Sequence, residues 1–173
     1  MPGLRINICF WYLDKSLLEK ILVILKENEL DPVYCACKDL KELEAFSSRE
    51  SPDLVISDFD LPDNLRNTLE QYMKEAYPDV PLIYLVGEKN ELRAAETLKY
   101  GVWDYILKDR LIGLAPSVYS SQKFGKVLKI SKQAKEHFRA LTENSPDVIM
   151  RFDRNYRHIY VNKALELQTG MQI

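Results

Sequence analysis

The sequence lacks a long apolar run and a strong charge of either sign. No stretch approaches the roughly 20 consecutive apolar residues that a membrane helix needs. A formal net charge of −2 argues against charge-driven binding to nucleic acid or to an anionic membrane. The apolar run 4–13 is not a cleaved signal, because Arg5 and Asn7 interrupt it and no small-residue cleavage site follows. We therefore expect no nucleic-acid partner and no membrane segment in these residues.

Cysteine is also scarce, with three in 173 residues. Cys35 and Cys37 alternate along what reads as a strand, and no second Cys/His pair has the spacing of a zinc site. Three is an odd number, so the thiols cannot all pair with one another. We expect reduced, partly buried thiols, as in a cytoplasmic protein.

The composition is that of an ordinary globular protein, with 46% hydrophobic and 29% charged residues. The length of 173 residues is enough for one full domain and part of another. This size needs neither disulfides nor a metal to complete its core.

One stretch organises the rest of the chain. Residues 54–57 form an apolar run typical of a parallel strand buried on both faces, and it ends at Asp58. A second apolar strand, 103–107, ends at Lys108. An aspartate that leaves a strand is by itself more often a helix cap or a turn former. Because strand ends in an open α/β sheet meet at one edge, however, this acid and this lysine can both face a phosphoryl group.

Strand and helix patterns alternate five times before residue 121. The expected strands are 4–12, 33–37, 54–58, 82–86 and 103–108. The expected helices follow Asp14 or Ser16, then cover 40–46, 66–77 and 90–98, and the last begins near Pro116. Helical crossovers between consecutive strands imply parallel pairing with helices on both faces. The sequence thus predicts an α/β, doubly wound five-stranded domain over residues 1–121.

The character changes after residue 121. Apolar residues recur every three or four positions at Val127, Ile130, Ala134, Phe138 and Leu141, with His137 beside them. This spacing predicts a helical stalk over 122–143, with Gly125 as an interior defect and a seam fit for a second copy of the chain. Two short strands, 147–152 and 157–161, and a helix, 163–169, follow. They are too few to build a core, so we expect the chain to stop inside a second domain.

The first region resembles the receiver domain of two-component response regulators. The motifs that carry this resemblance are PDLVISDFDLP at 52–62, PLIYL at 81–85 and GVWDYILKD at 101–109. It implies a flavodoxin-like fold with strand order 2-1-3-4-5. It also implies that Asp58 accepts a phosphoryl group from a phosphohistidine-bearing kinase or phosphotransfer protein, and that Lys108 contacts the phosphoryl oxygens. The backbone carbonyl of Asp60 would help hold Mg²⁺, and Tyr105 stands at the position of the aromatic switch.

The second region resembles the opening of a PAS sensor domain. The motifs are FRALTENSPD at 138–147 and YVNKA at 160–164. Residues 144–173 would be its first two strands and first helix. The resemblance implies a longer signalling parent, such as a hybrid histidine kinase, with PAS and kinase domains as downstream partners. The fragment itself is not expected to be an enzyme.

Two departures from the receiver pattern point to a degenerate site. Family receivers carry two adjacent acids after the first strand, whereas residues 9–13 hold none and Asp14, a weak candidate ligand, has helix capping as its default role. Val86 stands where the family has Ser or Thr, so the hydroxyl that bonds the phosphoryl group is missing. Mg²⁺ requires hard oxygen ligands, and we expect it to bind weakly or not at all.

We compared three hypotheses from the sequence. In the first, the chain is a phosphorelay receiver that still takes phosphate at Asp58. In the second, it is a pseudo-receiver that acts as an interaction or dimerisation module. The third, a flavodoxin-like cofactor binder, fails because no Gly- and Ser-rich phosphate loop follows the first strand.

Overall fold

The computed structural model describes residues 3–170. These residues fall into two compact units, which divide after Lys126. The division lies inside one helix, α5 (Leu114–Glu143). Each unit is described by itself below.

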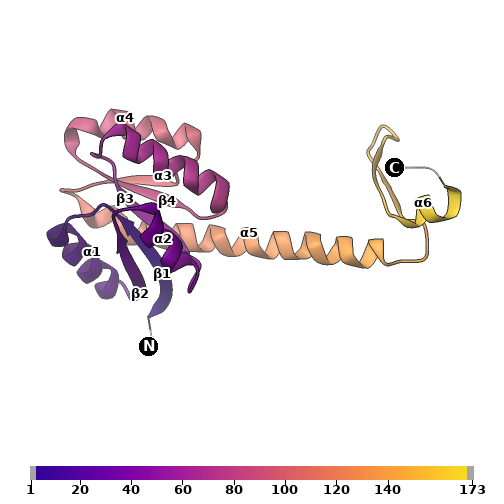
Figure 1. The fold of residues 1–173 in the computed structure, drawn as a ribbon, viewed down its shortest axis with the longest axis horizontal. Helices are drawn as coiled ribbons and strands as arrows, with labels where there is room; N and C mark the ends of the chain where they lie inside the picture. Colours follow the sequence, from indigo (N-terminus) through magenta and orange to yellow (C-terminus); the bar gives the residue numbers. More distant parts are fainter. Residues whose placement is uncertain (1–2, 171–173) are drawn as a thin grey trace. The chain divides into compact units, whose positions relative to one another are not determined.

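The first unit is a five-stranded parallel sheet with the order β2-β1-β3-β4-β5 (Figure 1). Its strands are β1 (Leu4–Trp11), β2 (Leu30–Cys37), β3 (Leu54–Asp58), β4 (Leu82–Val86) and β5 (Asp104–Leu107). Its helices are α1 (Lys15–Glu27), α2 (Leu40–Ser47), α3 (Asp63–Ala76), α4 (Glu91–Thr97) and the first part of α5. The predicted fold class and strand order are confirmed.

Apolar side chains pack on both faces of the sheet, as the near-continuous apolar strands require. On one face, Ile21 and Leu25 of α1 and Val118 of α5 cover alternate residues of β1 and β3. On the other face, Leu69 of α3 and Ala94 of α4 cover the residues between them. All five residues of β4 are buried, which places the core at the centre of the sheet.

Strand β2 begins at Leu30, three residues earlier than expected, and therefore contains Pro32. It pairs only with β1 and is an edge strand. The Tyr12 backbone N–H donates to the Cys37 carbonyl, so alternate residues back from Cys37 face β1 and Pro32 faces the open edge. Proline has no N–H to offer, and at this position the sheet loses no hydrogen bond.

Two helices also differ from the sequence expectation. Helix α3 begins at Asp63 rather than at Arg66, and the Arg66 guanidinium donates back to the Asp63 carboxylate at 2.6 Å. Helix α5 runs without interruption through Gly125. Pro116 lies in its first turn, where the backbone N–H groups have no partner within the helix to lose.

The second unit contains the antiparallel pair β6 (Met150–Phe152) and β7 (His158–Val161), followed by α6 (Ala164–Thr169). Both strands are shorter than expected. The fully buried Asn162 connects them to the end of α5: its Nδ2 donates to the carbonyls of Thr142 and Asp147, and its Oδ1 accepts from the Ile149 N–H. The last expected PAS residues, 171–173, lie outside the described residues.

Within residues 3–170, no helix is both long enough and apolar enough to cross a membrane.

We predict that Asp14 stabilises the first unit as a helix cap. Its Oδ1 accepts the Leu17 N–H at 2.9 Å. Asp14→Ala should lower the free energy of unfolding by about 1 kcal/mol, a typical loss for an N-cap. Chemical denaturation measures this change, with Asp14→Ser as the control that keeps an accepting oxygen. Equal losses in both variants would contradict the capping role.

Candidate functional site

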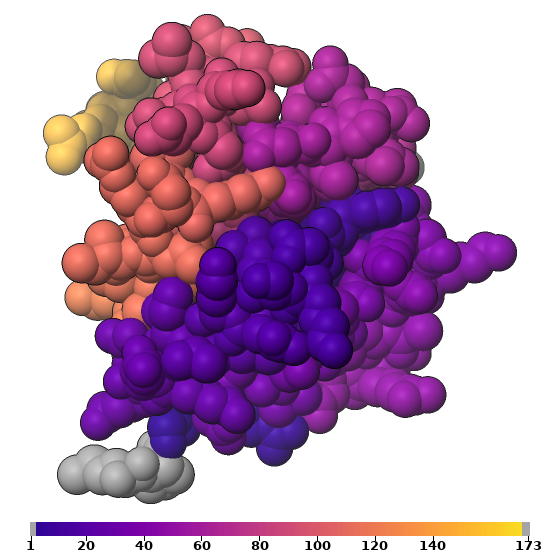
Figure 2. Space-filling view, turned by 90° about the vertical axis from the view of Figure 1, so that its left-hand side faces the viewer, coloured from indigo at the N-terminus to yellow at the C-terminus, as the bar shows by residue number. Residues whose placement is uncertain are grey.

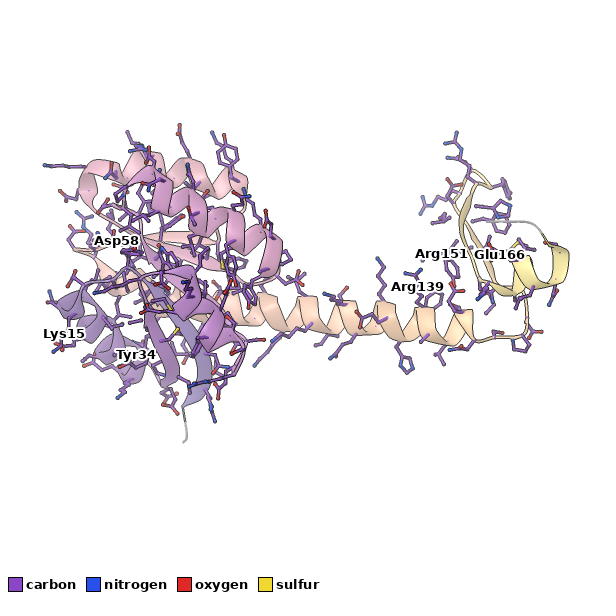
Figure 3. All side chains as sticks on the ribbon, viewed as in Figure 1. Lys15, Tyr34, Asp58, Arg139, Arg151 and Glu166 are labelled. Atoms are coloured by element: carbon purple, nitrogen blue, oxygen red, sulfur yellow. The ribbon has the colours of Figure 1, made fainter. Side chains whose placement is uncertain are left out.

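The carboxyl ends of β3 and β5 bring an acid and a lysine together. Asp58 is the last residue of β3 (Figure 3). Lys108 directly follows β5. The Lys108 Nζ donates to Asp58 Oδ1 at 2.6 Å, and both side chains are largely buried, with 26% and 17% exposed. Figure 2 shows this end of the unit, where segments from the indigo start of the chain to the orange residues near 110 meet. The ion pair is the juxtaposition that the sequence suggested.

The Asp60 side chain closes a network around this pair. Lys108 Nζ also donates to Asp60 Oδ2 at 2.8 Å. The Asp60 carboxylate further accepts the Gly87 N–H at 2.9 Å and the Asn90 Nδ2 at 2.8 Å, so three donors converge on one carboxylate. Asp60 in turn donates its own N–H to Asp58 Oδ1 at 2.8 Å.

Sequence reasoning had assigned Asp60 only a backbone role, and it had missed Gly87 and Asn90. The approach of the two loops explains the glycine, because a Cβ at Gly87 would lie 2.9 Å from Asp60 Oδ2. The signal available in the sequence was the Gly87 that directly follows a fully buried strand. The hollow beside the network is lined by residues 60, 87–90, 108 and 109.

Hydrogen bonds in this network stabilise the charged forms of Asp60 and Lys108. Burial opposes the charge on Asp60, but the hydrogen bonds from Lys108 and Asn90 outweigh it and keep the pKa of this carboxyl below its usual value. Burial likewise disfavours the Lys108 ammonium, but the hydrogen bonds to Asp58 and Asp60 raise its pKa. Lys108 is therefore a fixed positive charge shared by two carboxylates.

The end of β1 contributes aromatic rings instead of acids. Trp11 pairs in register with Ser57, so the next residues, Tyr12 and Asp58, lie at the same level of the sheet. Trp11 is 2% exposed and packs edge-to-face on Tyr12, with ring centroids 5.5 Å apart. Its indole N–H is buried without a hydrogen-bond partner among the described residues. The chain thus tolerates a cost of about 1–3 kcal/mol here.

The residues present do not fit the Mg²⁺ site that the resemblance implies. Asp14 caps α1 through its carboxylate and belongs to no cluster of acids. Among residues 3–170, the only group of three or more candidate metal ligands is a set of cysteines, not Asp58 and Asp60. The two carboxylates that remain already share Lys108. Aromatic side chains cannot supply the hard oxygen ligands that Mg²⁺ needs.

The two expected switch positions lie in one apolar cluster. Val86 is fully buried in the core cluster that also holds Phe59 and Tyr84. Tyr105, partly buried, packs against the same cluster. Val86 has no hydroxyl to offer a group at Asp58, and its backbone carbonyl accepts the Lys108 N–H at 2.9 Å.

The chain matches the family described as the response regulator receiver domain over residues 14–112, more than half of its length. The chain belongs to this family. Its first unit is therefore a receiver of phosphorelay signalling, as the sequence resemblance implied. Receiver domains generally bind Mg²⁺ at the phosphorylation site and interact with histidine kinases or phosphotransfer proteins.

Curated relatives match part of this chain. The regulatory protein LuxO of Vibrio cholerae is 32% identical over 66 residues, which cover 38% of this chain and 14% of LuxO. The response regulator protein PilR of Pseudomonas aeruginosa is 29% identical over 95 residues, 55% of this chain and 21% of PilR. The chain thus matches only a small part of these relatives' length.

Solved structures support the fold. A receiver domain from Clostridium thermocellum has a TM-score of 0.57 at 20% identity and covers 71% of this chain and 98% of its own. A structure described as adenylate cyclase from Rhodopirellula baltica has a TM-score of 0.63 at 16% identity and covers 77% and 98%.

We predict that the Asp60 contacts stabilise the receiver unit in a pH-dependent way. A carboxyl whose pKa is lowered by folding contributes its full stability above its unfolded value of 3.8 and loses it as the pH falls through the folded value. Urea unfolding from pH 7 down to pH 2 should therefore show the wild type more stable than Asp60→Asn, with a gap that closes below about pH 4.

The matched control is Asp109→Asn, which removes a half-exposed carboxylate that follows Lys108 in the sequence and pairs with Arg110 at 3.9 Å. This variant should show a much smaller gap at neutral pH. A gap between wild type and Asp60→Asn that stays constant from pH 7 to pH 2 would contradict the electrostatic role.

Proposed function

We propose that the receiver unit is a pseudo-receiver, an interaction module in which Asp58 is a poor phosphoryl acceptor. One observation carries the proposal: Lys108 is shared by Asp58 and Asp60 within 2.8 Å, while none of residues 9–13 at the end of β1 is acidic. In this arrangement the Lys108 ammonium and the Gly87 N–H both donate to the Asp60 carboxylate. An incoming phosphoryl oxygen would need these same two donors.

Electrostatics argue against efficient phosphorylation. Two unit charges about 4 Å apart interact by roughly 4 kcal/mol at an effective dielectric constant near 20. A dianionic phosphoryl group at Asp58 would be repelled by both Asp58 and Asp60, and Lys108 supplies a single positive charge. Val86 removes a further hydrogen bond, worth about 1 kcal/mol net.

The second candidate is a receiver that still accepts phosphate at Asp58. The retained ion pair between Asp58 and Lys108 favours it, because an aspartate nucleophile and a lysine for the phosphoryl oxygens are both present. In that case the partner would be a phosphohistidine-bearing kinase or phosphotransfer protein, and Asp60 would have to swing away first.

Phosphorylation by acetyl phosphate separates the two candidates. With acetyl phosphate and Mg²⁺, intact mass should show slow, substoichiometric labelling of the wild type and none of Asp58→Asn. A double variant, Tyr12→Asp with Val86→Thr, restores a carboxylate level with Asp58 and a hydroxyl on β4, and it should label faster with Mg²⁺. Asp also tolerates the left-handed backbone of Tyr12, where φ is 55°.

The result that refutes the pseudo-receiver is rapid, stoichiometric, Mg²⁺-dependent labelling of the wild type that Asp58→Asn abolishes. It would establish the second candidate instead.

We further propose that residues 144–173 begin a PAS sensor domain in a longer, non-membrane part of a signalling protein, such as a hybrid histidine kinase. The hairpin β6-β7 followed by α6, and the buried Asn162 that connects them to α5, support this proposal. Under this proposal the present chain is not itself an enzyme. The parent kinase would place these residues in the cytoplasm.

We predict that the chain dimerises through the later part of α5. Val127, Ile130, Phe138 and Leu141 are each at least 50% exposed and recur at helical spacing. Ile130→Glu should shift the molecular mass in light scattering from dimer to monomer, whereas Lys135→Glu, elsewhere on the same helix, should leave it unchanged. A wild type that is monomeric at high micromolar concentration would exclude this mode of association.

A further inference from the structure

Three cysteines converge on one face of the sheet, away from the Asp58 site. Strand register places Cys9 of β1 opposite Cys35 of β2, and alternation along β2 turns Cys37 to the same face. The Cys9 Sγ lies 3.4 Å from the Cys37 Sγ, which lies 3.2 Å from the Cys35 Sγ. All three sulfurs are within 4.8 Å of one another.

The geometry points to a binding site for a soft, thiophilic monovalent cation, and we propose that Cys9, Cys35 and Cys37 coordinate Cu(I). Thiolate ligands select Cu(I) and zinc over hard cations. With metal–sulfur bonds of about 2.3 Å, a planar trigonal site has sulfurs about 4.0 Å apart. The three sulfurs reach that spacing by moving less than about 1 Å, which side-chain adjustment can supply.

The choice of Cu(I) over zinc follows from the number of ligands. Structural zinc sites are almost always four-coordinate. Within residues 3–170, no fourth histidine, cysteine or carboxylate joins the cluster of three sulfurs. A three-sulfur site with no further ligand therefore suits a cation that accepts trigonal coordination.

Two of the three thiols are buried, and the third is the one that solvent can reach. Cys9 and Cys37 are buried in the core cluster with Trp11 and Leu43, whereas Cys35 is partly exposed on the edge strand β2. A cation would enter beside Cys35. Each thiol that coordinates releases its proton to the buffer, and no electron is transferred.

Packing alone is the simpler account, since free cysteines often fill cores as small hydrophobic residues. It explains the burial of each thiol. It does not require three cysteines on two adjacent strands to place their sulfurs in mutual contact, and it predicts that Cu(I) has no effect on the protein.

The test uses the full chain, reduced and free of oxygen, titrated with Cu(I) in competition with the chelator bicinchoninate. The wild type should retain one Cu(I) per chain at chelator concentrations that strip Cys35→Ser completely. Bound Cu(I) should also raise the thermal unfolding midpoint of the wild type and protect Cys35 from alkylation. Zn(II) at the same concentration should do neither.

The matched control is Tyr34→Phe, whose side chain leaves the opposite face of β2 and which keeps all three thiols. It should bind Cu(I) like the wild type. Cys35→Ser changes the most accessible of the three and should fold normally, and Cys9→Ser serves as a second ligand variant.

Equal copper retention by wild type and Cys35→Ser would overturn the proposal, because the ion would then bind elsewhere. A loss of two mass units on copper treatment would also overturn it, since that result identifies a disulfide rather than a coordinated ion.

Discussion

The receiver unit depends on one lysine that serves two carboxylates. Lys108 leaves β5 at the same edge where β3 ends in Asp58, and the turn after β3 returns Asp60 to the same ammonium group. Burial makes each of these charges costly alone, and the network makes them compatible. The hydrogen bonds of Asp60 to Gly87 and Asn90 extend the network to the loop after β4. The network thereby connects the ends of β3, β4 and β5. In a phosphorylated receiver, the same donors would bind the phosphoryl group.

Much of this unit could be predicted from the sequence because its strands and helices carry strong local patterns. The buried run 54–57, the acid at its end and the lysine after β5 were sufficient to place Asp58 and Lys108 at one edge. The early start of β2 was missed because proline normally argues against a strand, although the implied strand order already made β2 an edge, where proline is tolerated. The role of the Asp60 side chain was missed for a related reason. Its three donors come from residues 87, 90 and 108, which are distant in the sequence.

The end of β1 shows what replaced the acids of the family. The buried Trp11 indole, whose N–H has no hydrogen-bond partner among residues 3–170, packs edge-to-face on Tyr12 at this strand end. Burial of the Trp11 ring contributes apolar contact on the order of 2–3 kcal/mol, comparable with the cost of the unpaired N–H. Apolar packing therefore holds the carboxyl end of β1, and the neighbouring Cys9 and Cys37 belong to the same apolar cluster.

Pro32 has a consequence for how the receiver unit meets other molecules of its own kind. Strand β2 is eight residues long and its outer side is not paired with any described strand. Such an edge is a template on which a second sheet can grow, and natural proteins interrupt it to stay monodisperse. Pro32 has no N–H, and it lies between Leu30 and Tyr34, whose backbone N–H groups point toward the open edge. An incoming strand would therefore miss one hydrogen bond of the ladder. A residue that looked like a strand breaker in the sequence is thus a guard against sheet-to-sheet aggregation.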